Sequence, residues 1–125
     1  MKTLMNILYL FLFIHGSVFA DSFILNSLPE AQKLSQQTQQ PILLIFGSES
    51  CNFCSFLKND LDSVLKKDVE NFIVCYLDIK SDPELKKQYN VTLIPDSRII
   101  SNDKTVFSIK GYNQKNYKKW LENAK

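Results

Sequence analysis

The sequence contains a single histidine, His15, and it lies among the first twenty residues. Residues 21–125 therefore contain none, which excludes Ser-His-Asp and Cys-His catalysis from that part of the chain. It also excludes metal sites there that depend on histidine ligands. Acid–base chemistry in residues 21–125 would have to come from carboxylates, lysine, tyrosine or cysteine.

An excess of charge of either sign is also missing. The chain has 15 lysines and arginines against 13 aspartates and glutamates, which gives a formal net charge of +2. Nucleic-acid-binding domains are typically much more basic, so we expect no nucleic-acid partner. The sequence shows no repeats and no low-complexity tail, and a chain of 125 residues is expected to hold one domain.

The first twenty residues have the layout of a secretory signal rather than of folded structure. A positive start is followed by an apolar stretch from Leu4 to Ile14, and Val18-Phe19-Ala20 suits the positions that signal peptidase reads. We expect residues 1–20 to be a signal peptide cleaved near Ala20, and residues 21–125 to form the mature domain, periplasmic or secreted. A retained membrane anchor is the alternative, but the apolar stretch is shorter than the roughly 20 residues of a bilayer span.

Cysteine is scarce, and its spacing is informative. All three cysteines lie after residue 20, and two of them form a Cys51-x-x-Cys54 pair. Zinc requires about four ligands, and covalent haem requires histidine directly after the second cysteine, where this chain has Ser55. A structural disulfide would close a very small loop and stabilise little. A redox-active pair is therefore favoured over a metal site or an inert staple, and Cys75 is expected to be a buried packing residue.

The apolar pattern predicts an α/β domain. Continuous apolar runs of strand length indicate strands buried on both faces, and apolar residues at helical spacing indicate helices that cover them. The expected order is helix 29–38, strand 42–46, helix 51–67, strand 72–79, helix 83–89, hairpin strands 97–101 and 105–110, and helix 113–123. This order predicts a mixed central sheet of about four strands with helices on both faces.

The arrangement around the cysteine pair resembles the thioredoxin family, and in particular its exported members. A buried strand leads into Cys51-x-x-Cys54 at the start of a helix. About forty residues later, VTLIP resembles the family's loop that ends in a cis-proline, here Ile94-Pro95. A hairpin, Gly111 and a C-terminal amphipathic helix follow, so the resemblance covers nearly all of residues 21–125. It implies a thioredoxin-like fold and a thiol–disulfide oxidoreductase activity.

The resemblance also implies roles for individual residues. Cys51 would attack a disulfide and Cys54 would resolve the mixed disulfide, so that Cys51–Cys54 is the redox-active disulfide. A helix N-terminus favours the attacking thiolate, because its unpaired N–H groups and its dipole present positive charge. Ile94 and Pro95, in the loop that faces the pair, would dock the substrate chain.

The residues beside the pair differ from the family pattern. Ser50 replaces the usual tryptophan, and Asn52-Phe53 replaces Gly-Pro. An aromatic residue at the position of Phe53 is also found in glutaredoxins and periplasmic disulfide isomerases. We assign Phe53 to substrate binding, with packing as the alternative, and Asn52 to modulation of the pair.

Charged positions near the pair differ as well. Ile45 replaces the family's buried acid six residues before the first cysteine, and Glu49 is its candidate substitute, with a solvated loop charge as the alternative. Asp96 follows the proline. If Asp96 faces Cys51, its charge disfavours the thiolate and makes the pair more reducing, unless Arg98 neutralises it.

These observations favour a reductase over an oxidase, since strongly oxidising relatives place a histidine inside the motif. No metal or organic cofactor is expected. The expected partners are protein thiols and disulfides and a membrane-bound electron donor, and the protein is expected to be a monomer. A non-catalytic thioredoxin-like binding or chaperone module is the alternative, and a metal carrier is a weaker one.

Overall fold

The structure is a computed structural model that describes residues 23–124. The expected signal peptide, residues 1–20, lies outside these residues, and its cleavage stays a prediction. The elements are β1 (Ile24–Leu25), α2 (Leu28–Thr38), β2 (Ile42–Gly47), α3 (Asn52–Leu61), β3 (Ile73–Asp78), α4 (Pro83–Gln88), β4 (Asp96–Ser101), β5 (Lys104–Lys110) and α5 (Gln114–Asn123). Among residues 23–124, none of the helices combines the length and the apolar composition that a bilayer span requires.

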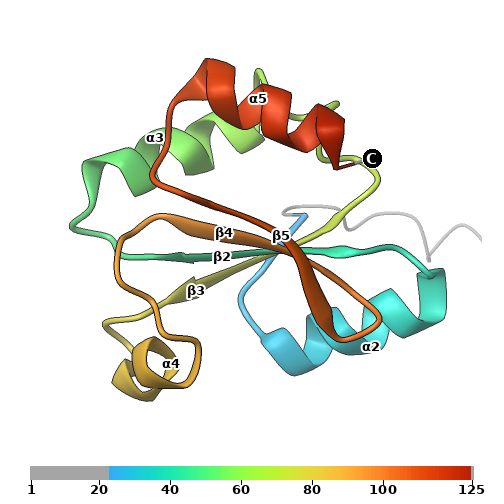
Figure 1. Ribbon diagram of the computed structural model, residues 1–125, viewed down its shortest axis with the longest axis horizontal. Coiled ribbons are helices and arrows are strands. Elements are labelled where there is room, and N and C mark those ends of the chain that lie inside the picture. Colours follow the sequence, from blue (N-terminus) through green and yellow to red (C-terminus); the bar gives the residue numbers. More distant parts are fainter. Residues whose placement is uncertain (1–22, 125) are drawn as a thin grey trace, which may run out of the picture.

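The strands form one mixed sheet in the order β1-β3-β2-β4-β5. β1 and β2 both run parallel to β3, whereas β4 is antiparallel to β2 and to β5. α3 and α5 cover one face of the sheet, and α2 and α4 cover the other (Figure 1). The predicted α/β fold with helices on both faces is confirmed, but the sheet has five strands instead of about four. β1 has only two residues, too few for a periodic pattern to reveal it.

β2 is buried along its whole length because helices cover both of its faces. Leu43 and Ile45 pack into the core beneath α3 and α5. Leu44 and Phe46 alternate with them and pack into a second core with α2. Cys75 of β3 belongs to this second core and is fully buried, as expected from its place in an apolar strand.

α3 is shorter than the sequence predicts. It ends at Leu61, and the chain continues through turns to residue 72 instead of remaining helical to residue 67. The turns are held by backbone bonds such as Leu65 N–H to the Asp60 carbonyl, 2.8 Å. Leu65 and Val69 are still buried, so their spacing continues the apolar pattern although the backbone no longer forms a helix.

Side chains cap the first turns of α2 and α5, but not that of α4. Ser27 caps α2 by accepting a hydrogen bond from the Glu30 N–H, 3.4 Å, and Pro29 occupies the first turn. Asp82 precedes α4 as expected, but its side chain makes no capping hydrogen bond. Asn113 caps α5 by accepting from the Asn116 N–H, 3.1 Å.

A buried hydrogen bond joins α5 to the sheet, and its removal should destabilise the protein. Tyr117 and Ser97 are both fully buried, and the Tyr117 hydroxyl donates to Ser97 Oγ at 2.8 Å. Burial raises the pKa of Tyr117 above its usual value, so the phenol stays neutral. We expect Tyr117→Phe to lower the free energy of unfolding by about 1–2 kcal/mol, because it deprives a buried hydroxyl of its donor.

Denaturant unfolding of Tyr117→Phe, Ser97→Ala and the double variant would measure this effect. The double variant removes both polar groups, so it should cost less than the two single variants together. Additive losses would show that the two hydroxyls do not depend on each other.

Candidate active site

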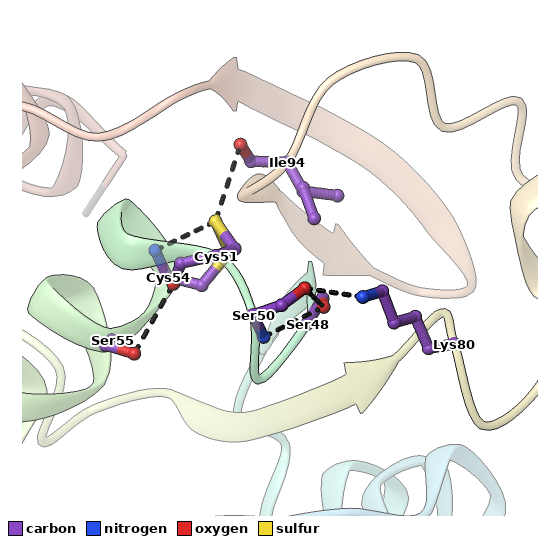
Figure 2. Close-up of a disulfide and its surroundings, with 7 residues drawn as sticks. All are labelled: Ser48, Ser50, Cys51, Cys54, Ser55, Lys80 and Ile94. Carbon is purple, nitrogen blue, oxygen red and sulfur yellow. Dashed lines mark hydrogen bonds between the residues drawn. A yellow bond between two sulfur atoms is a disulfide. The ribbon is translucent and has the colours of Figure 1, made fainter.

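Cys51 and Cys54 form a disulfide at the junction of β2 and α3, with their Cα atoms 5.2 Å apart (Figure 2). Cys51 is the N-cap of α3 in an extended conformation, φ −97° and ψ 114°. Its sulfur accepts a hydrogen bond from the backbone N–H of Cys54 at 3.2 Å. In the reduced state the same N–H, at the positive end of the helix dipole, favours a thiolate on Cys51.

The two sulfurs differ in their access to solvent. Cys54 is fully buried in the core beneath α3, whereas Cys51 is only partly buried. An incoming disulfide can therefore reach Cys51 and not Cys54. This asymmetry suits Cys51 for attack and Cys54 for resolution, as the sequence predicts.

The loop before β4 lies against Cys51. The Cys51 Sγ is 4.0 Å from the carbonyl oxygen of Ile94, and the Ile94–Pro95 peptide bond is cis. The residue that follows β5 fixes this loop, because the Gly111 N–H donates to the Pro95 carbonyl at 2.7 Å. The structure thus brings the Cys51–Cys54 pair next to Ile94 and Pro95, although about forty residues separate the two segments in the sequence.

The surface beside the disulfide is apolar. Phe53 and Phe56 are 58% and 55% exposed, and their rings meet edge to face with centroids 6.2 Å apart. Leu93, in the loop that carries Ile94, is 54% exposed. Phe53 is therefore not a core residue, and its exposure beside Cys54 agrees with the substrate-binding assignment.

The fold and the cysteine site lead to the comparison with known proteins. The family model described as Thioredoxin matches residues 28–123. The chain belongs to the thioredoxin family. No curated protein is similar enough in sequence to be matched to it.

Solved thioredoxin structures share its fold. The thioredoxin of Fasciola hepatica has a TM-score of 0.68 at 19% identity, and the match covers 82% of this chain and 98% of that one. A thioredoxin from Nicotiana alata has a TM-score of 0.68 at 17% identity, with 86% and 97% covered. A thioredoxin from Plasmodium falciparum has a TM-score of 0.67 at 20% identity, with 82% and 98% covered.

Family membership and the Cys51–Cys54 disulfide make this chain a thiol–disulfide oxidoreductase. Proteins of the thioredoxin family act on protein disulfides. Among residues 23–124, no three histidine, cysteine, aspartate or glutamate side chains gather in a group that could hold a metal ion.

Asp96 lies elsewhere than the sequence suggested. It is paired with Phe46 across the β2–β4 ladder, which places its side chain on the face covered by α2 and α4. There it is 1% exposed and forms an ion pair with Arg98 at 3.1 Å. It therefore does not face Cys51, and the proposed effect of its charge on the thiolate is wrong. β4 also begins at Asp96, earlier than predicted, because this ion pair buries an otherwise polar strand start.

The family's buried acid has no counterpart next to Cys54. Ile45 is fully buried in the same core as Cys54. In the described part of the chain the buried carboxylates are Asp68 and Asp96, which are bound to Lys118 and Arg98. Neither is free to take the Cys54 proton.

The remaining candidates, Glu49 and Asn52, are both exposed. Glu49 lines a surface cavity together with Lys58 and Asp78. It is a solvated loop charge, not a buried proton acceptor.

Phe56 also lies on the exposed apolar surface beside the disulfide, although its helical spacing from Leu57 and Leu61 alone would predict a core-facing position. Its position three residues after Phe53 could have revealed this placement. Residues i and i+3 of a helix are neighbours on its surface, so both aromatic rings emerge beside the disulfide.

Proposed function

We propose that this protein is an exported thioredoxin-family reductase that acts as a monomer on protein disulfides. The observation that carries the proposal is the environment of the Cys51 sulfur. Within residues 23–124 its one hydrogen-bond donor is the Cys54 N–H, and the Ile94 carbonyl oxygen lies 4.0 Å away on another side. Strong oxidants owe their power to a stabilised reduced form, and a sulfur with one donor and a facing carbonyl lacks that stabilisation.

The exchange follows from the two cysteines. The Cys51 thiolate attacks one sulfur of a substrate disulfide, which forms a mixed disulfide and releases the other substrate sulfur as a thiolate. Cys54 then loses its proton and attacks the Cys51 sulfur, which releases the second substrate thiolate and closes the Cys51–Cys54 bond. The substrate gains two electrons, and the pair loses two.

The pair must then be reduced again, and we propose a membrane-bound electron donor for this step.

Export is supported by the signal-like residues 1–20, and the mature chain would begin at Asp21. Mass spectrometry of the exported fraction should find that N-terminus. A chain that stays in the cytosol with Met1 still attached would contradict export.

The apolar surface around the disulfide fits the same function. Phe53, Phe56 and Leu93 are each more than half exposed, and they lie beside the sulfur that substrates must reach. Partly unfolded or flexible proteins expose apolar side chains next to their cysteines. Such chains could pack against these rings while their backbone docks at Ile94.

The reduction potential of the pair tests the direction of electron flow. We expect equilibration with glutathione to give a potential near that of thioredoxin, about −270 mV. Quantifying the oxidised and reduced protein after acid quenching across a series of glutathione ratios measures it. A potential near −120 mV, typical of a strong oxidant, would overturn the reductase proposal.

A further inference from the structure

Lys80 connects the turn after β3 to the residue that precedes the attacking cysteine. Its Nζ donates a hydrogen bond to Ser50 Oγ at 2.5 Å, across 30 residues of sequence (Figure 2). The parallel register explains the meeting. Gly47 and Asp78 are partners at the ends of β2 and β3, so the loops that follow both strands emerge side by side.

Both ends of this connection are fixed. The Lys80 N–H donates to Asp78 Oδ1 at 2.8 Å, which holds the turn that carries the lysine. On the other side, the Ser48 and Ser50 hydroxyls are 3.0 Å apart, and the Ser50 N–H donates to Ser48 Oγ at 3.3 Å. Ser48 is 1% exposed, so a buried side chain anchors the loop.

The same serine reaches the attacking cysteine. The Cys51 N–H donates to the Ser48 carbonyl at 3.2 Å. Lys80, Ser50, Ser48 and Cys51 therefore form one connected set of hydrogen bonds, which ends at the Lys80 ammonium. Because Ser50 and Cys51 are adjacent, the ammonium is bound to the residue next to the attacking cysteine, and its field acts on the Cys51 sulfur.

The other charges near this loop do not cancel that effect by contact. Glu49 in the loop, Lys58 on α3 and Asp78 at the end of β3 all line the neighbouring surface cavity. Lys58 lies over the ring of Tyr76, with Nζ 4.5 Å from the centroid. Asp78 binds the backbone of Lys80 and not its ammonium.

We propose that Lys80 is a positioning residue for Cys51, holding the loop through Ser50 and favouring the Cys51 thiolate by its positive charge. The ammonium makes no contact with the reacting sulfur. It acts on that sulfur through its electrostatic field and by holding the loop of residues 48–51 in place. A thiolate that forms more readily attacks substrate disulfides faster at neutral pH. The inference rests on Cys51 as the attacking sulfur. A positive charge that does not contact the sulfur shifts the pair only slightly towards the oxidising side, so the direction of electron flow is decided by the reduction potential of the pair.

The test uses residues 21–125, the chain expected after signal cleavage, with the substitutions Cys54→Ser and Cys75→Ser. Cys51 is then the single thiol. The rate of Cys51 alkylation by iodoacetamide is measured across pH. We expect Lys80→Met to lower the rate at pH 7 about threefold and to move the midpoint of the pH profile upward, since a nearby cation is lost. Lys80→Arg should restore the rate, because arginine keeps both the charge and the donor.

Lys87→Met is the matched control, since Lys87 is an exposed lysine of α4 on the other side of the turn. It removes the same charge from the protein without touching Ser50. A pH profile of Lys80→Met that equals that of the parent, or a Lys87→Met profile that shifts as much, would overturn the proposal. Neither result would alter the measured reduction potential of the native pair, so this proposal and the reductase proposal fail separately.

Discussion

Replacing Cys54 by serine should abolish turnover and leave substrate proteins covalently attached to Cys51. Cys51 is the accessible sulfur, whereas Cys54 is fully buried and its role is to release the bound substrate. Without it, each molecule completes the attack and stops. We expect reduction of an insulin-like disulfide substrate to fall by about a thousandfold or more, in line with the loss of a residue that acts with the nucleophile as a unit.

Non-reducing gels and mass spectrometry of proteins recovered with the Cys54→Ser variant would show the mixed disulfides. Cys51→Ser should trap nothing, and Cys75→Ser should trap no more than the parent protein, since Cys75 lies in the other core. Equal trapping by the Cys51→Ser and Cys54→Ser variants would contradict the assigned roles. No trapping by the Cys54→Ser variant, with turnover retained, would contradict disulfide exchange through this pair.

Replacing Gly47 by alanine should destabilise the protein. Tyr76 packs directly on the backbone of Gly47, and a Cβ at that position would lie 2.1 Å from the Tyr76 hydroxyl and 2.5 Å from Cζ of its ring. The ring is held in place from above by Lys58. We expect a loss of about 1–3 kcal/mol in the free energy of unfolding, because the extra methyl cannot be admitted without displacing the end of the Tyr76 ring, which lines a surface cavity.

Denaturant unfolding of a double-variant cycle would measure this clash. In a Tyr76→Val background the ring is gone, so Gly47→Ala should cost less than about 1 kcal/mol. Gly111→Ala is the matched control. Its φ of +79° strains alanine by about 1–2 kcal/mol, but its Cβ would make only an ordinary contact, 3.9 Å from Leu93 Cδ2, so its cost should be the same in both backgrounds. A Gly47→Ala variant as stable as the parent would show that the ring moves freely.

The environment of Tyr76 also explains why it does not replace the missing acid. Burial, and then the negative charge of Asp78, raise the pKa of Tyr76 above its usual value. At neutral pH it is therefore a neutral phenol that cannot accept a proton. Resolution by Cys54 must therefore release its proton without help from Tyr76.

The parts of the fold that the sequence predicted are those with strong local patterns. β2 and the first five residues of β3 are buried and largely apolar because both faces are covered, and such runs are visible without tertiary information. The Cys51-x-x-Cys54 pair and the Ile94-Pro95 dipeptide could also be placed, since their spacing along the chain matches a known family. The structure then added what spacing cannot give, which is the contact between the Cys51 sulfur and the Ile94 carbonyl.

The parts that failed depend on register and on neighbours distant in sequence. Asp96 directly follows Pro95, yet its pairing with Phe46 across the strands places its side chain on the face covered by α2 and α4. A one-residue shift in register would reverse that, and sequence alone does not fix it. Lys80 belongs to no sequence motif that would mark it as a site residue. Its proximity to the site follows only from the structure, in which the pairing of β2 with β3 brings Ser50 beside it.

The reactivity of Cys75 can be used to measure how often the fold opens. With the Cys51–Cys54 bond closed it is the free thiol of the chain, fully enclosed on the far side of the sheet from the redox pair. Burial raises the pKa of the Cys75 thiol to about 12, so it is both shielded and protonated. A thiol reagent in solution can reach it only when β3 is exposed. Its labelling rate thus reports how often the sheet opens.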